Sequence, residues 1–113
     1  MIEKTIMDYL NEHLEVPVWL ELPEGEETPE SYVLLEKTGS GRKDHISTAT
    51  FAVQSYGKRM IDAARLNEQV KAAMDSLVTL NEVSRSALNS DYNFTDTQKK
   101  QYRYQAVYDI VHY

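Results

Sequence analysis

The sequence is short of several residue types, and each shortage excludes a class of protein. It has no cysteine, so it can form neither a disulfide scaffold nor a thiolate metal site. No apolar run approaches the roughly 18 residues that a membrane span requires. The first 14 residues are amphipathic and acidic, and they lack the basic start of a signal peptide. We therefore expect a single cytosolic domain that covers residues 1–113, with no membrane partner.

Positive charge is also scarce. Twelve lysines and arginines face eighteen aspartates and glutamates, which gives a net charge of −6 and a pI of about 5.0. Tight binding to nucleic acid needs a dense basic surface, so we expect none here. The composition is otherwise that of a globular domain, since 42% of the residues are hydrophobic and 27% are charged.

Periodicity predicts an α+β protein. Its expected elements, in chain order, are a helix over residues 2–13, strands over Val16–Leu22 and Ser31–Lys37, a mobile hairpin tip over Thr38–His45, a strand over Ile46–Tyr56, a helix over residues 59–77, and strands over Asn81–Phe94 and Gln101–Tyr113. This α-β-β-β-α-β-β order favours a mostly antiparallel sheet, with an N-terminal helix and one long amphipathic helix packed on it.

Three details add positions to this outline. Pro17 restricts the first strand to an edge or to its own start, because proline donates no ladder hydrogen bond. Ala49, Phe51 and Val53 alternate onto one face of their strand, where we expect the long helix to pack. The last strand carries apolar residues on both faces, so it is either central in the sheet or covered by a partner.

No group of residues forms a recognisable catalytic, metal or cofactor site. His13, His45 and His112 fall in a helix, a loop and a strand, without the spacing of a helical metal site. The glutamates between Glu21 and Glu30 crowd a turn, which is a solvated setting rather than the apolar pocket that a general acid needs. The segment TGSGRK (38–43) precedes a strand rather than a helix, so it is no phosphate loop. We expect a protein that is not an enzyme and holds no cofactor or metal.

Tyrosine is the most unusual residue by number. There are eight, and four of them fall in the last strand: Tyr102, Tyr104, Tyr108 and Tyr113. Tyrosine is common in strands, and it is also favoured at protein interfaces, where an apolar ring carries a polar tip. The sequence leaves both interpretations open.

Three stretches of the sequence form a recognisable pattern: the segment VPVWLELPEG…PESYVLLE, the strand STATFAVQSYG that runs directly into the helix KRMIDAARLNEQVKAAMDSL, and the closing strand from Arg103 to His112. Through them the chain has a resemblance to the tail-terminator, or tail-completion, proteins of long-tailed bacteriophages and prophages. This resemblance implies a structural virion protein of the tail or neck, assembled in the host bacterial cytoplasm. Such proteins form rings, usually hexameric, that end tail-tube growth and contact both the tail tube protein and the head connector protein.

In such a ring, oppositely charged segments would suit head-to-tail contacts. The candidate subunit interface consists of Glu24, Glu26, Glu27, Arg42, Lys43, Tyr102, Tyr104 and Tyr108. Two rival functions remain, a head–tail adaptor (head-completion) protein of the neck and a small acidic cytosolic inhibitor or interaction module. Ring formation, and binding to the tube rather than to the connector, would separate the three.

Overall fold

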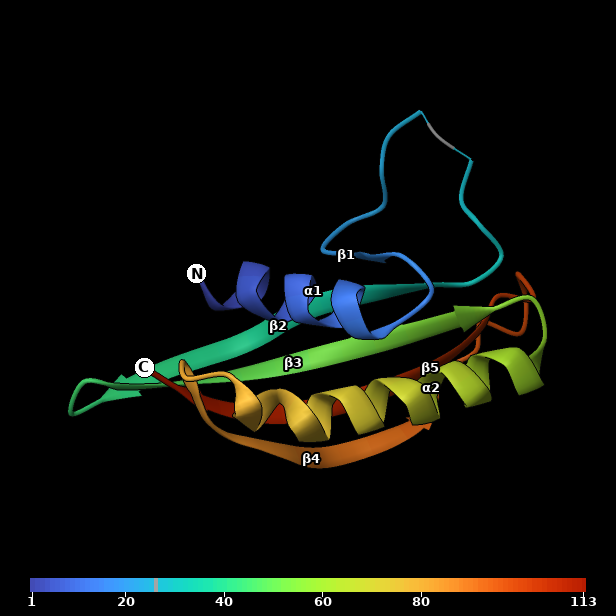
Figure 1. Cartoon of the computed structure of the whole chain (residues 1–113). Coiled ribbons are helices and arrows are strands. Elements are labelled where there is room, and N and C mark those ends of the chain that lie inside the picture. The colour runs from blue at the N-terminus through green and yellow to red at the C-terminus, as the bar shows by residue number, and fades with distance from the viewer. Residues whose placement is uncertain (26) are drawn as a thin grey trace.

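The computed structural model describes residues 1–25 and 27–113, which form one five-stranded sheet with both helices on the same face (Figure 1). The elements are α1 (Ile2–His13), β1 (Val18–Trp19), β2 (Tyr32–Lys43), β3 (Ile46–Gly57), α2 (Met60–Asp75), the 3₁₀ turn η1 (Ser76–Thr79), β4 (Val83–Asn93) and β5 (Tyr102–His112). The strand order is β1-β2-β3-β5-β4, and every pair is antiparallel except β1 with β2. The predicted α+β class and element order are confirmed.

The core lies between the sheet and the two helices. Ala49, Phe51 and Val53 of β3 are buried on the helix-covered face, as predicted. They share one hydrophobic cluster with residues of β5 and α2, and β5 is central, between β3 and β4. Helix α1 adds Ile6 and Leu10, both completely buried, to the same cluster.

A tight corner joins β3 to α2. A β-carbon added to Gly57 would lie 2.5 Å from the backbone nitrogen of Ala63 and 2.9 Å from the carbonyl carbon of Asp62. Only a residue without a side chain lets the first turn of α2 approach the end of β3 so closely. The geometry of the corner is therefore set by the packing of α2 against β3.

The first strand is much shorter than expected. The predicted span Val16–Leu22 is wrong in its extent, because only Val18 and Trp19 pair with β2. Pro17 contributes a carbonyl oxygen that accepts a hydrogen bond from the Val33 nitrogen at 2.9 Å, but it has no N–H to donate. After Trp19 the chain leaves the sheet, and Leu20 is 42% exposed rather than on a buried face.

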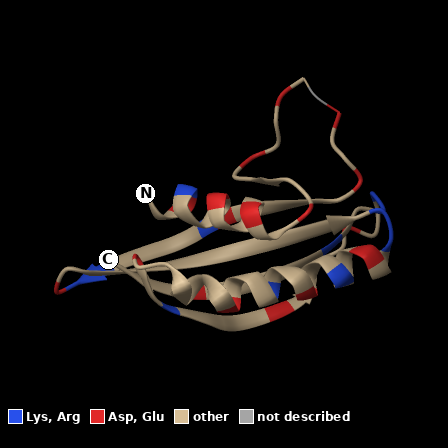
Figure 2. Ribbon diagram, viewed as in Figure 1, with Lys and Arg blue, Asp and Glu red and all other residues tan. Residues whose placement is uncertain are grey.

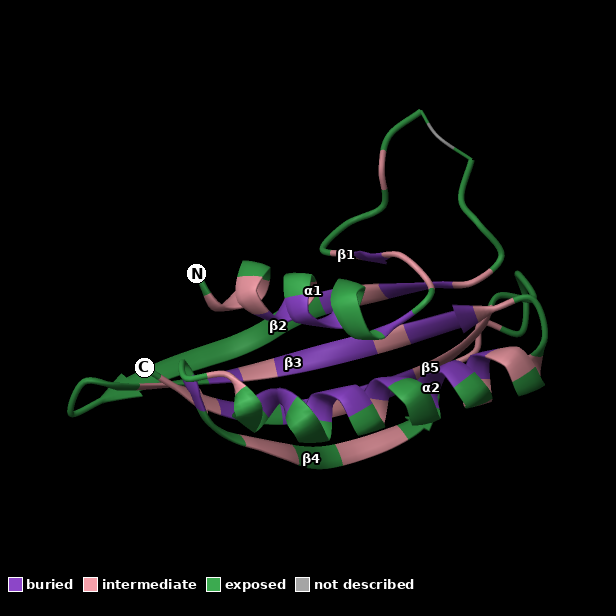
Figure 3. Ribbon diagram, in the orientation of Figure 1, coloured by how far each residue is buried: buried purple, intermediate pink, exposed green. Residues whose placement is uncertain are grey.

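The second strand is longer than expected, and the predicted hairpin tip Thr38–His45 is correct in kind but wrong in its extent. Strand β2 continues through its two glycines to Lys43, because the full length of β3 pairs with it. Only Asp44 and His45 turn, with φ angles of 51° and 67°. Positive φ at both positions is the geometry of a two-residue hairpin loop that matches the twist of its strands. The far end of this hairpin projects beyond the helices and is exposed on both faces (Figure 3).

Candidate functional site

The acidic and basic segments predicted for a subunit interface lie at opposite ends of β2 (Figure 2). Glu24 and Glu27 are exposed on the connection between β1 and β2, which loops away from the body of the molecule (Figure 1). Glu26, the third predicted residue of this connection, lies outside the described residues. Arg42 and Lys43 are exposed beside the hairpin turn. Within one chain these two segments are therefore separate surfaces, each free to contact another molecule.

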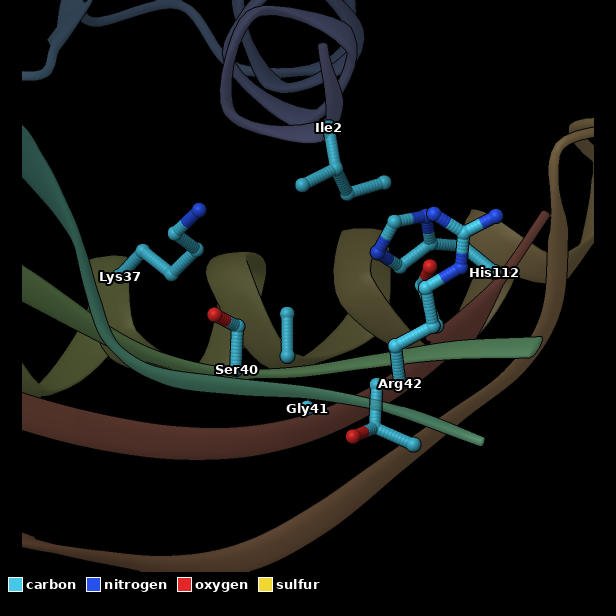
Figure 4. Close-up of a pocket in the computed structure, with 9 residues that line it drawn as sticks. Ile2, Lys37, Ser40, Gly41, Arg42 and His112 are labelled. Carbon is cyan, nitrogen blue, oxygen red and sulfur yellow. The ribbon is translucent and has the colours of Figure 1, made fainter. Parts of the chain in front are cut away.

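A hollow of about 390 Å³ lies on the helix side of the hairpin, below the first turn of α1 (Figure 4). Its polar lining comes from Lys37, Ser40, Arg42, Ser47, Thr48 and His112. Lys37 pairs with Glu3 of α1, at 3.1 Å between its Nζ and the carboxylate. A backbone hydrogen bond and this lysine hold the pKa of Glu3 below its usual value. The hollow is open to solvent, and the charged residues that line it are two cations, of which Lys37 is already paired with Glu3.

Tyr108 belongs to the core and not to a surface. Its ring is completely buried, and its hydroxyl donates to the Asp75 carboxylate at 2.8 Å, with the carbonyl oxygen of Lys71 3.2 Å away. Burial, reinforced by the hydrogen bond to Asp75, raises the pKa of the phenol well above its usual value. Because the side chain is enclosed within its own chain, we remove it from the candidate interface.

Tyr102 and Tyr104 have a different position from Tyr108. Both are partly exposed at the start of β5, level with Gly57 and Ser55 of β3. They lie on the helix-covered side of the sheet, next to the corner that begins α2. Of the three predicted tyrosines, these two keep surface that a partner could contact.

An aromatic row on the uncovered face of the sheet has no counterpart in the sequence analysis. Tyr32 stacks on Tyr56 with a 4.5 Å centroid distance, and Trp19 lies 5.8 Å beyond Tyr32. Arg103 continues the row, with its guanidinium carbon 5.7 Å from the Tyr56 ring centre and 4.5 Å from that of Phe94. The same guanidinium donates to the Tyr56 hydroxyl at 3.0 Å and to the carbonyl oxygen of Phe94 at 2.7 Å.

This row joins β1, β2, β3 and β5 to the residue that follows β4, so it ties together the end of the sheet where the acidic connection begins. Tyr32 and Tyr56 are almost completely buried by their neighbours. Burial also raises the pKa of Tyr32 above its usual value. Because Arg103 and the Tyr56 hydroxyl are hydrogen-bonded within the row, we interpret it as a structural brace rather than a reactive site.

The histidines stay apart in the structure as well. The ring of His13 stacks on Tyr9 at 4.0 Å, and its Nδ1 lies 2.8 Å from the Tyr9 carbonyl oxygen. The Nδ1 of His112 lies 3.1 Å from the carbonyl oxygen of Tyr113. Neither contact joins a histidine to a serine or threonine hydroxyl, which is one arrangement that nucleophilic catalysis uses. Across residues 1–25 and 27–113, no three side chains of the metal-binding types gather closely enough to hold an ion.

Comparison with family models and with curated proteins finds no relative. No protein-family model matches the chain, and no curated protein is similar to it in sequence. No helix in the described part of the chain is long and apolar enough to cross a membrane. Arguments about function therefore depend on the chain's own surfaces.

Proposed function

We propose that the chain is a structural subunit of a bacteriophage or prophage tail. Copies of it assemble into a ring, with six subunits as the expected number, at the head-proximal end of the tail tube. The ring ends tube growth and joins the tail to the head. Its partners are other copies of the chain, the tail tube protein and the head connector protein.

The observation that carries this proposal is that two segments project from the core and contribute none of their described residues to its hydrophobic cluster. Residues 38–48 of the β2–β3 hairpin (the outer hairpin) are nearly all exposed, and none of them belongs to the hydrophobic cluster. The connection between β1 and β2 likewise holds Leu22 and Glu24 out in solvent. Polar segments of this kind add little to folding, so contacts with other molecules are the better reason for them.

The test removes the gene and measures tails. In a phage or prophage that encodes this chain, loss of the chain should leave tail tubes of uncontrolled length without heads, as seen by electron microscopy. Supplying the chain from a plasmid should restore tails of one length. Tails of normal length that carry heads in the absence of the chain would contradict the proposal.

The same proposal makes a statement about DNA. A genome that passes through a ring must not adhere to it, and the net charge of −6 per chain favours repulsion of phosphate. At physiological salt, non-specific DNA binders have dissociation constants of roughly 10⁻⁴–10⁻⁶ M, and we expect this chain to bind duplex DNA more weakly than that. A mobility-shift titration with a random duplex measures this affinity. Micromolar, salt-sensitive binding would contradict a ring through which DNA passes without adhering.

A further inference from the structure

Among residues 1–25 and 27–113, two long strand edges of the sheet have no pairing strand. Strand β1 covers β2 only at Val33 and Leu34, which leaves the edge of β2 from Leu35 to Lys43 open. At the other side of the sheet, β4 pairs with β5 and with no further strand among the described residues. An open edge presents a row of unpaired N–H and C=O groups, and natural proteins usually shorten or cover such edges. Here both edges are nine residues or longer.

The directions of the two edges fit each other. Strand β2 is antiparallel to β3, β3 to β5, and β5 to β4, so β2 and β4 run in opposite directions. When two copies lie side by side in the same orientation, β4 of one copy therefore meets β2 of the next as an antiparallel pair. Copies related by a rotation axis have this arrangement, and a contact between two different patches builds a ring.

The two edges also lie at the same height on the sheet. Ladder partners connect Leu35 through Val53 and Ala106 to Asp91, and they connect Arg42 through Ser47 and His112 to Val83. The open part of β2 thus spans the same level as residues 83–91 of β4. Adjacent copies can pair these edges without sliding along the strand direction.

Side-chain charge favours this pairing over pairing of β2 with itself. The open edge of β2 carries three cations, Lys37, Arg42 and Lys43, and one anion, Glu36, so two such edges in contact would bring together a net positive charge. Strand β4 is mostly serine, asparagine and apolar residues, with Arg85 as its one cation and Asp91 as its one anion. It therefore opposes the β2 cations with little repulsion.

We propose that the β4 edge of one copy adds to the β2 edge of a second copy, so that one antiparallel sheet continues from subunit to subunit. This inference rests on the proposed function, because it names the contact that would hold the ring together. Backbone hydrogen bonds supply the attraction, as in other strand-addition contacts. The two bulges of β4, near Val83 and Leu88, limit how many of those bonds form.

The absence of cysteine makes the contact directly testable, since any introduced pair is the only pair. Gly39 and Ala87 lie at one level and on one face, through their partners Thr50 and Asp109. A β-carbon at Gly39 meets nothing within 4 Å. Opposed residues of antiparallel strands have α-carbons roughly 4.5–5.5 Å apart, within the range that a disulfide spans.

The experiment oxidises purified Gly39→Cys/Ala87→Cys protein and separates the products without reductant. A ladder of covalent oligomers that collapses on reduction is expected, while neither single variant should form one. Gly41→Cys/Arg85→Cys tests the same face two positions along, because Gly41 and Arg85 lie at one level through their partners Thr48 and Val111. This second pair remains available if Ala87→Cys folds poorly. Gly39→Cys/Leu88→Cys is the matched control, because Leu88 pairs with the buried Tyr108 and so points to the opposite face.

Three results would overturn the inference. A covalent dimer from a single variant would show that like edges pair, and equal crosslinking by the Leu88→Cys control would show unspecific collision. The absence of crosslinks in both test pairs would exclude this strand contact even if sedimentation shows a ring. None of these results bears on tail length, so the proposed function stands or falls separately.

Discussion

The two halves of the β2–β3 hairpin use the same pair of strands in opposite ways. In the inner half, Val33, Leu35 and Phe51 are buried beneath the helices. In the outer hairpin, residues 38–48, the pairing continues but both faces meet solvent (Figure 3). Backbone pairing alone contributes little net stability, since the unfolded chain bonds to water instead. The comparison teaches that folding depends on the inner half, which leaves the outer half free for contacts with other molecules.

Truncation in the inner half should have the largest effect on folding. Phe51→Ala removes a completely buried ring from the centre of the cluster, which should lower the free energy of unfolding by about 3–5 kcal/mol. Thr48→Ala, an exposed position in the outer hairpin, is the matched control and should change it by less than about 0.5 kcal/mol. Chemical denaturation measures both, and similar losses at the two positions would remove the distinction between the halves.

Two glycines, Gly57 beside α2 and Gly39 in the outer hairpin, allow a second comparison between the two regions, with a smaller expected effect. Gly57→Ala places a methyl group 2.5 Å from the Ala63 nitrogen, so the corner must shift, at a cost of about 1–3 kcal/mol. Gly39→Ala meets open space in the outer hairpin and should cost nothing measurable. Thermal unfolding of the two variants tests this, and equal melting temperatures would show that the close approach of α2 to β3 is not required.

The buried hydroxyl of Tyr108 should make the stability of the core depend on pH in the alkaline range. Tyr108→Phe removes the hydroxyl that donates to Asp75 and should lower the free energy of unfolding by about 1 kcal/mol at neutral pH. Because burial raises the pKa of Tyr108, the folded state keeps this proton above about pH 10, where an unfolded tyrosine loses it. Above that pH the unfolded state binds fewer protons than the folded state, so the free energy of unfolding falls as the pH rises further.

The measurement is urea unfolding between pH 8 and 11, on either side of the ordinary tyrosine pKa of about 10. The Phe variant lacks this ionisation, so its stability should fall less steeply than that of the native chain. Parallel curves would show that Tyr108 does not contribute to alkaline unfolding.

Much of the fold could be predicted from the sequence, because the spacing of apolar residues in several segments is clearly that of a helix or of a strand. The helix over residues 2–13 and the alternation around Phe51 needed no tertiary information. The outer part of β2 could not be predicted, since TGSGRK has poor strand propensity and is extended only by pairing with β3. Tertiary pairing overrides local preference in strands more readily than in helices.

The surface features were predictable to a smaller extent. Exposure of Glu24 and Arg42 follows from their charge, but the burial of Tyr108 could not be separated from an interface position by sequence alone. The contact of Arg103 with Phe94 and Tyr56 joins parts of the chain that are neighbours only because β5 inserts between β3 and β4. The open edges of β2 and β4 likewise depend on strand order, which the sequence did not reveal.

The smallest expected effect is at the tip of the outer hairpin. His45 has a φ of 67°, and a residue with a β-carbon in this left-handed region is strained by roughly 1 kcal/mol, whereas glycine is not. His45→Gly creates the Asp-Gly pair that two-residue hairpin loops prefer, although glycine also makes the unfolded chain more flexible. The two effects nearly cancel, so global stability should change by less than about 0.5 kcal/mol.

Relief of strain should still act locally, because the tip can open without unfolding the core. Hydrogen exchange of the amides between Ser40 and Thr48 should therefore slow in the variant, while exchange in α2 stays the same. Faster exchange at the tip would show that His45 holds the turn by its side chain, and a matching change in α2 would show that the two halves of the hairpin unfold together.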